Sequence, residues 1–190
     1  MTGKIVEKKV MGKVITTMNV LKQKEEAELV YEYTNRACQF LLKLILDGKT
    51  FLVTDSGFTI DIIDVENKKI VNQIDDLAGN LIRCGIIIDK MIFLGIEAPA
   101  KEKNEGNILV YDSKTFKKIG SESTDEMVTP FCFKSIVSNA NQFMCGMSNG
   151  CLQVFSINKN NANPVRGASK MIEAAPMHGE IYQIIETWDS

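Results

Sequence analysis

Hydrophobic and polar residues alternate along most of the chain in short runs, a period of two that predicts β-strands with one buried face. The clearest runs begin with a glycine and continue with β-branched or aromatic residues. There are four of them, Gly12 to Met18, Gly57 to Val65, Gly106 to Asp112 and Gly150 to Phe155. Their glycines are 44 to 49 residues apart, so the alternation itself repeats and predicts a chain built from repeated all-β units.

Turn residues precede three of these glycines, as Asp55-Ser56, Asn104-Glu105 and Ser148-Asn149. Glycine adopts a positive φ at no steric cost, so Gly57, Gly106 and Gly150 are expected to close tight hairpins in that conformation. A short apolar strand is predicted before each turn, at residues 51–54, 91–94 and 142–145.

Two more strands complete each unit. The strand furthest upstream carries a cysteine each time, Cys38, Cys84 and Cys132, which are 46 and 48 residues apart. A more polar strand follows the glycine strand, at residues 69–74 and 117–120. The pattern therefore predicts units of four strands.

A unit of four strands and about 45 residues, with a glycine at the turn before its third strand, resembles a blade of the WD-repeat propellers. In that family the third strand tends to end in Trp-Asp, and the matching pairs here are Met18-Asn19, Ile63-Asp64, Tyr111-Asp112 and Phe155-Ser156. The resemblance covers residues 12 to 187 with degenerate repeats. It implies an all-β β-propeller of four-stranded antiparallel blades, with about three complete blades plus partial blades at both ends.

One propeller unit is predicted over residues 1–190, with blades at 37–78, 79–124 and 125–175. Residues 1–36 are expected to form a partial first blade or an N-terminal extension, and residues 176–190 to start a further or closing blade. A ring of four blades could close if residues 5–10 supplied a missing strand; otherwise a longer chain or a partner supplies the other blades. Residues 22–29 contain good helix formers, but the alternation over residues 28–34 favours a strand.

Composition narrows the classes of partner. The 22 basic and 24 acidic residues are spread along the chain without a basic patch, so no nucleic-acid partner is expected. The longest apolar run, residues 40–46, is broken by Lys43 and is too short to span a bilayer, so no membrane association is expected. Five cysteines without a C-x-x-C pair indicate a reducing, cytoplasmic location rather than a zinc site or disulfides.

Candidate catalytic groups are few. His178 is the only histidine and is expected to be structural or exposed. Cys38, Cys84 and Cys132 could form a thiolate ring around the propeller axis, although small packing residues are the favoured interpretation. The pairs Asp75-Asp76 and Asp125-Glu126 are expected to solvate loops. The sequence therefore predicts no enzyme, no cofactor and no metal; the alternatives are a propeller hydrolase or lyase with an axial carboxylate site, and a non-functional fragment of a longer propeller protein.

Charge separates the two ends of the predicted blades. In the loops that join one blade to the next, all charged residues are acidic. The corners at the opposite end carry Lys68, Lys69, Lys114, Lys117, Lys118 and Lys159. The longest predicted loop, residues 97–105, lies on the acidic side. A partner-binding face is therefore predicted on Asp75, Asp76, Glu97, Lys101, Glu102, Glu122, Asp125 and Glu126. We expect a non-enzymatic protein-binding module or scaffold subunit of an intracellular complex, with an unclosed blade edge as a second place for pairing.

Overall fold

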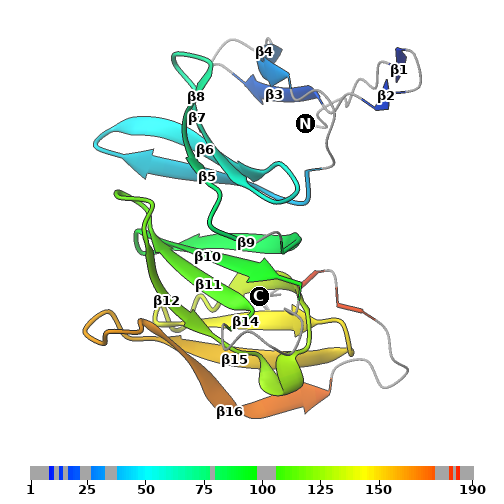
Figure 1. Ribbon diagram of the computed structural model, residues 1–190, viewed down its shortest axis with the longest axis vertical. Helices are drawn as coiled ribbons and strands as arrows, with labels where there is room; N and C mark the ends of the chain where they lie inside the picture. Colours follow the sequence, from blue (N-terminus) through cyan, green and yellow to red (C-terminus); the bar gives the residue numbers. More distant parts are fainter. Residues whose placement is uncertain are drawn as a thin grey trace, which may run out of the picture.

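The computed structural model describes residues 9–10, 13–14, 17–21, 27–32, 38–77, 80–97, 106–173, 180–181 and 183–184. Within these ranges the chain is made of β-strands, with a single 3₁₀ turn at Asp125–Met127 (η1) and no α-helix. None of these residues belongs to a helix that is long and apolar enough to cross a membrane. The strands form an open arc of stacked sheets (Figure 1).

Three sheets of four antiparallel strands make up the body of the arc. In each sheet the strands follow one another in chain order, so each strand pairs with the strand that precedes or follows it in the sequence. The first sheet contains β5 (Leu41–Leu46), β6 (Lys49–Asp55), β7 (Ile60–Asp64) and β8 (Lys69–Ile74). The second contains β9 (Ile82–Ile88), β10 (Met91–Ile96), β11 (Ile108–Asp112) and β12 (Lys118–Glu122). The third contains β13 (Pro130–Ser135), β14 (Gln142–Met147), β15 (Cys151–Ile157) and β16 (Val165–Glu173).

Two short hairpins precede these sheets. They pair β1 (Lys9–Val10) with β2 (Lys13–Val14), and β3 (Thr17–Leu21) with β4 (Ala27–Glu32). The strand that the alternation favours over residues 28–34 is confirmed as far as β4 extends. Of the predicted closing strand, residues 5–10, the structure describes only Lys9 and Val10, which pair with β2. Closure of a four-bladed ring therefore stays a prediction.

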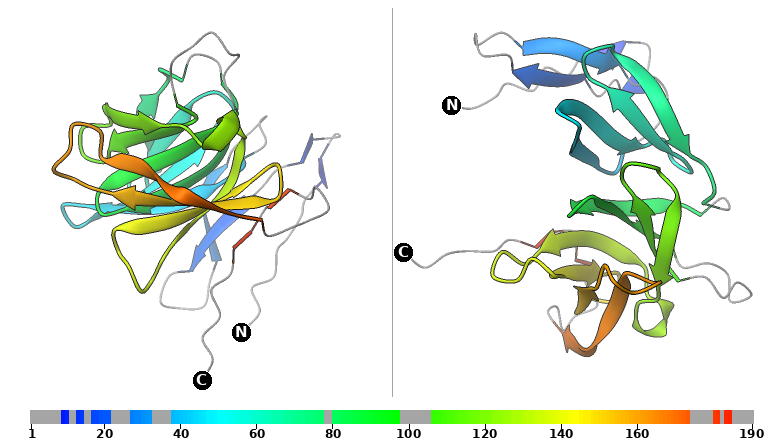
Figure 2. Two further views of the ribbon diagram at one scale, coloured as in Figure 1. Left: turned by 90° about the horizontal axis from the view of Figure 1, so that it is seen from below. Right: turned by 90° about the vertical axis from the view of Figure 1, so that its left-hand side faces the viewer.

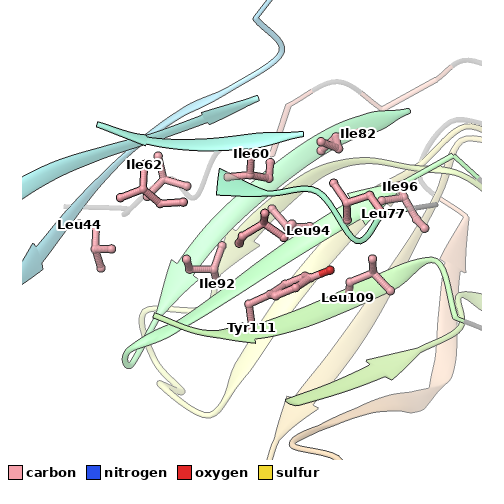
Figure 3. Close-up of a cluster of buried hydrophobic side chains, with 12 residues drawn as sticks. Leu44, Ile60, Ile62, Leu77, Ile82, Ile92, Leu94, Ile96, Leu109 and Tyr111 are labelled. Carbon is pink, nitrogen blue, oxygen red and sulfur yellow. The ribbon is translucent and has the colours of Figure 1, made fainter. Parts of the chain in front are cut away.

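Two apolar cores bind the sheets together. The first lies between the β5–β8 and β9–β12 sheets and includes Val53, Ile62, Ile92 and Leu94, none of which is exposed to solvent (Figure 3). The second lies between the β9–β12 and β13–β16 sheets and is rich in aromatic rings, with Phe143 stacked on Phe155 at 5.3 Å. Since the β9–β12 sheet contributes to both cores, it is the central layer of the arc.

The aspartates that match the second residue of Trp-Asp close the corners between the third and fourth strands. The Oδ1 atom of Asp64 accepts hydrogen bonds from the backbone N–H groups of Glu66 and Asn67, at 2.9 and 3.0 Å. Asp112 does the same for Lys114 and Thr115, at 3.1 and 2.7 Å. The side-chain amide of Asn67 donates to Asp64 Oδ2 at 2.7 Å and is the main cause of the lowered pKa of Asp64. The backbone N–H of Thr115 is the main cause of the lowered pKa of Asp112, so both turns favour the charged carboxylate.

The hairpin glycines do not all act in the same way. Gly57 and Gly150 have the expected positive φ, at 97° and 80°. The prediction for Gly106 is wrong, because its φ lies outside the left-handed region. Gly106 is required for a different reason: a Cβ atom there would overlap the backbone of Glu122.

Candidate interaction face

Antiparallel order brings one set of loops to the same end of every sheet. The turns after β6, β10 and β14 and the connections that lead into β9 and β13 all lie at this end, which we call the loop face. The other end carries the turns after β5, β9 and β13 and the lysine-bearing corners. Figure 2 shows the sheets of the arc from two further directions. The predicted division of the loops between two faces follows from this strand order.

A hollow of about 380 Å³ opens on the loop face between the first and second sheets. Its wall on the first sheet is the turn after β6, and its wall on the second is the start of β9. Apolar and charged side chains both contribute to it, so it offers contacts of both kinds. The lining residues are Gln39, Asp55, Ser56, Gly57, Phe58, Leu81, Ile82 and Arg83.

Asp55 is the buried acid of this hollow, with 1% of its surface exposed. Its Oδ1 atom accepts hydrogen bonds from the backbone N–H groups of Gln39 and Phe40, at 2.7 and 3.2 Å, and so fixes the chain just before β5. The Oδ2 atom has no hydrogen-bond partner. Burial raises the pKa of the Asp55 carboxyl, and the backbone N–H groups beside it oppose this rise only in part.

Arg83 faces the same hollow from β9. Its Nη2 atom donates to Glu97 Oε1 at 3.0 Å, and its guanidinium lies 5.8 Å from the ring centre of Phe131 on the next sheet. The Nε atom of Arg83 is buried without a hydrogen-bond partner. Phe58, by contrast, is 49% exposed at the hollow and gives it an apolar contact surface.

Two of the predicted acidic residues anchor the connections between sheets. Asp76, before β9, accepts a hydrogen bond of 2.7 Å from the hydroxyl of Tyr111 on β11. Asp125, before β13, accepts one of 3.0 Å from Gln153 on β15, whose own side-chain oxygen accepts the backbone N–H of Asp125. In each case a connection is tied to the third strand of the sheet that it leads into.

The other predicted binding residues are not gathered at one point. Glu97 is paired with Arg83 at the edge of the hollow, and Glu122 accepts the backbone N–H of Ser123 at 3.1 Å. Asp75 is exposed beside Asp76. Lys101 and Glu102 lie outside the described residues, as does His178, and for Glu126 the structure describes the backbone only.

Sequence reasoning did not single out Asp55, Phe58 and Arg83. Asp55 was noticed only as turn chemistry, and Arg83 lies 28 residues further along, on another sheet. Only the packing of the two sheets brings these residues to one hollow. The sequence does contain a signal for Asp55, because this acidic residue directly follows an apolar strand and lies at the end of that strand, where the turn begins.

Cys84 and Cys145 are buried as packing groups would be and Cys132 is half-buried, whereas Cys38 is exposed. Cys84 lies in β9 and Cys132 in β13, whereas Cys38 precedes β5 rather than lying in a strand. Burial raises the pKa of Cys84, Cys132 and Cys145, so these three thiols stay protonated at neutral pH. In the part of the chain that the structure describes, no three His, Cys, Asp or Glu side chains are grouped to hold a metal ion.

Comparison with known proteins places the fold but not the family. No protein-family model matches the chain, and no curated protein matches it. Among solved structures, it is similar to a chain of the mitotic checkpoint complex with a TM-score of 0.55 and 11% identity, over 76% of this chain and 41% of that one. It is similar to BBS1N in complex with ARL6DN with a TM-score of 0.53 and 12% identity, over 75% and 47%.

A third similar structure is the complex of KlAtg21 with the coiled coil of AgAtg16, with a TM-score of 0.58 and 12% identity, over 90% of this chain and 51% of that one. The chain thus spans about half the length, or less, of the chains that it matches. These neighbours are of the propeller type. The predicted fold class is therefore confirmed: the chain is an all-β, propeller-type protein with three four-stranded antiparallel sheets and partial blades at its ends.

Proposed function

We propose that this chain is a non-enzymatic protein-interaction module, a scaffold subunit of a cytoplasmic complex that binds other proteins through its loop face. The observation that carries the proposal is the hollow between the first two sheets, where exposed Phe58 lies with buried Asp55 and half-buried Arg83. An apolar anchor beside charged groups is the arrangement that protein interfaces use at their centres. Stacked sheets hold these loops on a rigid support.

The comparisons support the same class of function. Three of the similar structures are described as complexes, and one of them contains a coiled-coil partner. We propose that this chain likewise belongs with the WD-repeat-like propellers and binds protein partners. The acidic loops of the loop face would give a basic partner surface faster association, with a strong dependence on salt.

The test compares partner recovery from cell extract by the wild-type chain and by variants of one face at a time. Phe58→Asp and Asp75→Lys change the loop face and leave the anchors at Asp76 and Asp125 intact. The matched controls lie at the opposite end: Val137→Asp, since Val137 is 61% exposed, and Lys117→Glu. We expect both loop-face variants to lose the same partners and both controls to keep them. Loss of those partners in the controls alone would move the binding site to the other face.

A further inference from the structure

Two atoms with opposite hydrogen-bonding needs are unpaired in the hollow between the first two sheets. In the part of the chain that the structure describes, three buried side-chain atoms lack a hydrogen-bond partner: Asp55 Oδ2, Arg83 Nε and Ser113 Oγ. Asp55 and Arg83 both line the hollow, and all of its lining residues are among those described. Unpaired buried polar atoms are rare in native proteins, so two in one hollow point to a group that binds there.

Each of these side chains is fixed at one end and unpaired at the other. Asp55 Oδ1 accepts the backbone N–H groups of Gln39 and Phe40, which leaves Oδ2 as an unpaired acceptor. Arg83 is held by its Nη2 atom, which donates to Glu97, and its Nε atom is an unpaired donor. Since neither atom has a partner, the two are not bonded to each other. The hollow therefore presents one acceptor and one donor, from two different sheets.

The chemistry of these two atoms selects an uncharged ligand group. An ammonium or guanidinium group has donors only, so it would pair Asp55 but leave Arg83 Nε unpaired and bring a second positive charge near it. A carboxylate has acceptors only and would lie against Asp55. A hydroxyl group offers no more than a water molecule does, so it gains little by displacing one. A carboxamide carries an acceptor oxygen and two N–H donors and can pair both atoms.

Apolar surface beside the two polar atoms suits the residue next to the carboxamide. Phe58, in the turn after β6, is 49% exposed at the hollow, and Leu81 and Ile82 line the hollow from the second sheet. An exposed aromatic ring offers a large, rigid contact surface to an apolar side chain. The volume of about 380 Å³ lies within the range of pockets that hold small ligands, so the hollow admits side chains and not a folded element.

We propose that the hollow recognises the side-chain carboxamide of an asparagine or glutamine in a partner protein, with an apolar neighbouring residue on Phe58. The carboxamide donates to Asp55 Oδ2 and accepts from Arg83 Nε. A side chain suits this role better than a main-chain amide, because Asp55 has only 1% of its surface exposed and lies deep in the hollow. This inference rests on the function proposed above, since it names the chemistry that the loop face binds.

The experiment is an NMR titration of the isotope-labelled chain with four dipeptide probes that differ in one side chain. They are acetyl-phenylalanyl-glutamine N-methylamide and its lysine, glutamate and threonine counterparts. We expect the glutamine probe to give saturable shifts of the Arg83 Nε–H signal and of the Gly57 and Phe58 amide signals at about millimolar concentrations. The other three probes should bind about tenfold more weakly, because none of them replaces water with a group that pairs both atoms.

Asp55→Asn should change the preference of the hollow rather than abolish binding. The side-chain oxygen of the new residue has to accept the N–H groups of Gln39 and Phe40, so its NH₂ group takes the place of Oδ2. The hollow then presents two donors, which suit a carboxylate. We expect this variant to bind the glutamate probe about tenfold more tightly than the glutamine probe. A variant that had merely lost its fold would show no such switch.

Arg83→Lys isolates the donor. Lysine keeps a positive charge for Glu97 but has no Nε–H group, so the glutamine probe should bind about tenfold more weakly. Arg166→Lys is the matched control, because Arg166 is exposed on β16 and does not line the hollow. It should bind the glutamine probe as the wild type does. Unchanged amide signals in the β13–β16 sheet check that the Asp55→Asn and Arg83→Lys variants are folded.

The outcomes separate this inference from the proposed function. Equal binding of all four probes, no shift of the Arg83 Nε–H signal, or no change of preference in Asp55→Asn would overturn carboxamide recognition. The proposed function fails on other evidence, if Phe58→Asp and Asp75→Lys both keep the partners of the wild type. Loss of partners in those two variants, together with a glutamine probe that does not bind, would leave the loop face as the interaction site and reject the carboxamide as its ligand.

Discussion

Single residues in this chain are constrained for reasons that residue type alone does not reveal. Gly57 and Gly106 hold similar places in the repeat, yet Gly57 has a φ of 97° with nothing within 4 Å of a would-be Cβ, whereas Gly106 is crowded by the Glu122 backbone. Conformational strain at one site and steric overlap at the other give different costs of substitution.

Alanine at these two positions separates the costs. Gly57→Ala should lose about 1 kcal/mol of unfolding free energy, the strain of an alanine at positive φ. Gly106→Ala should lose at least about 3 kcal/mol, because the backbone of β12 has to move. Urea denaturation measures both. Equal losses would contradict the assignment of Gly106 to close backbone approach.

The raised pKa of Asp55 predicts how the stability of the fold depends on pH. Its pKa is raised by burial, so the folded chain binds its proton more tightly than the unfolded chain, and its contribution to stability falls as pH rises from about 4 through the raised pKa. Asp55→Asn keeps an oxygen for the N–H groups of Gln39 and Phe40 but cannot titrate. The stability of the wild type relative to this variant should therefore decline across that window.

Thermal unfolding of both proteins between pH 3.5 and 7 provides the comparison. Asp64 and Asp112, whose pKa values are lowered, contribute stability that is lost as pH falls, but they do so equally in both proteins. Asp55→Ala is the control for hydrogen bonding and should be about 1 to 3 kcal/mol less stable than Asp55→Asn at every pH, since the part-buried N–H groups of Gln39 and Phe40 lose their acceptor. Parallel curves for wild type and Asp55→Asn would rule out titration of Asp55 in this range.

At the scale of elements, each connection between two sheets is held by a side chain of the sheet that it leads into. Asp76 is bound by Tyr111, and Asp125 by Gln153, across 35 and 28 residues of sequence. These acids were predicted to be partner contacts because they lie in polar loops. Their bonds give them a structural role in addition, so a change at exposed Asp75 is the cleaner probe of the predicted binding.

The anchor can be tested by removing one hydroxyl. Tyr111→Phe should lose about 1 kcal/mol and raise hydrogen exchange in the residues leading into β9, because their tie to β11 is gone. Asp75→Asn, at an exposed neighbouring position, should change stability by less than about 0.5 kcal/mol. If Tyr111→Phe and Asp76→Ala have additive effects in a double-mutant cycle, the bond does not stabilise the fold.

Strand order and strand number could be predicted from the sequence because alternation and turn residues act locally. Strand β4 was expected from the same signal. What local patterns cannot supply is the relation between sheets: the hollow at Asp55 and Arg83, the Tyr111 anchor and the crowding of Gly106 all depend on packing between distant segments. The prediction of a strand at Cys38 was wrong for a similar reason. The Asp55 carboxylate accepts the backbone N–H groups of Gln39 and Phe40, and β5 begins only after them, at Leu41.

For the molecule as a whole, the two cores make each sheet depend on its neighbours. The β9–β12 sheet shares Ile92 and Leu94 with the first sheet, and Phe93 with the third. Repeat proteins with contacts of this kind transmit destabilisation most strongly to the nearest repeat. The arc should therefore lose protection in a graded order rather than all at once.

Two cavity variants test this order. Phe143→Ala removes a fully buried ring that lies 5.0 Å from Phe93 and should cost about 3 to 5 kcal/mol. Hydrogen exchange should then rise most in β13–β16, next in β9–β12 and least in β5–β8. Ile62→Ala, in the first core, should give the reverse order, since Ile62 is also fully buried. If both variants expose all three sheets equally, the arc unfolds as one cooperative unit and the nearest-neighbour description fails.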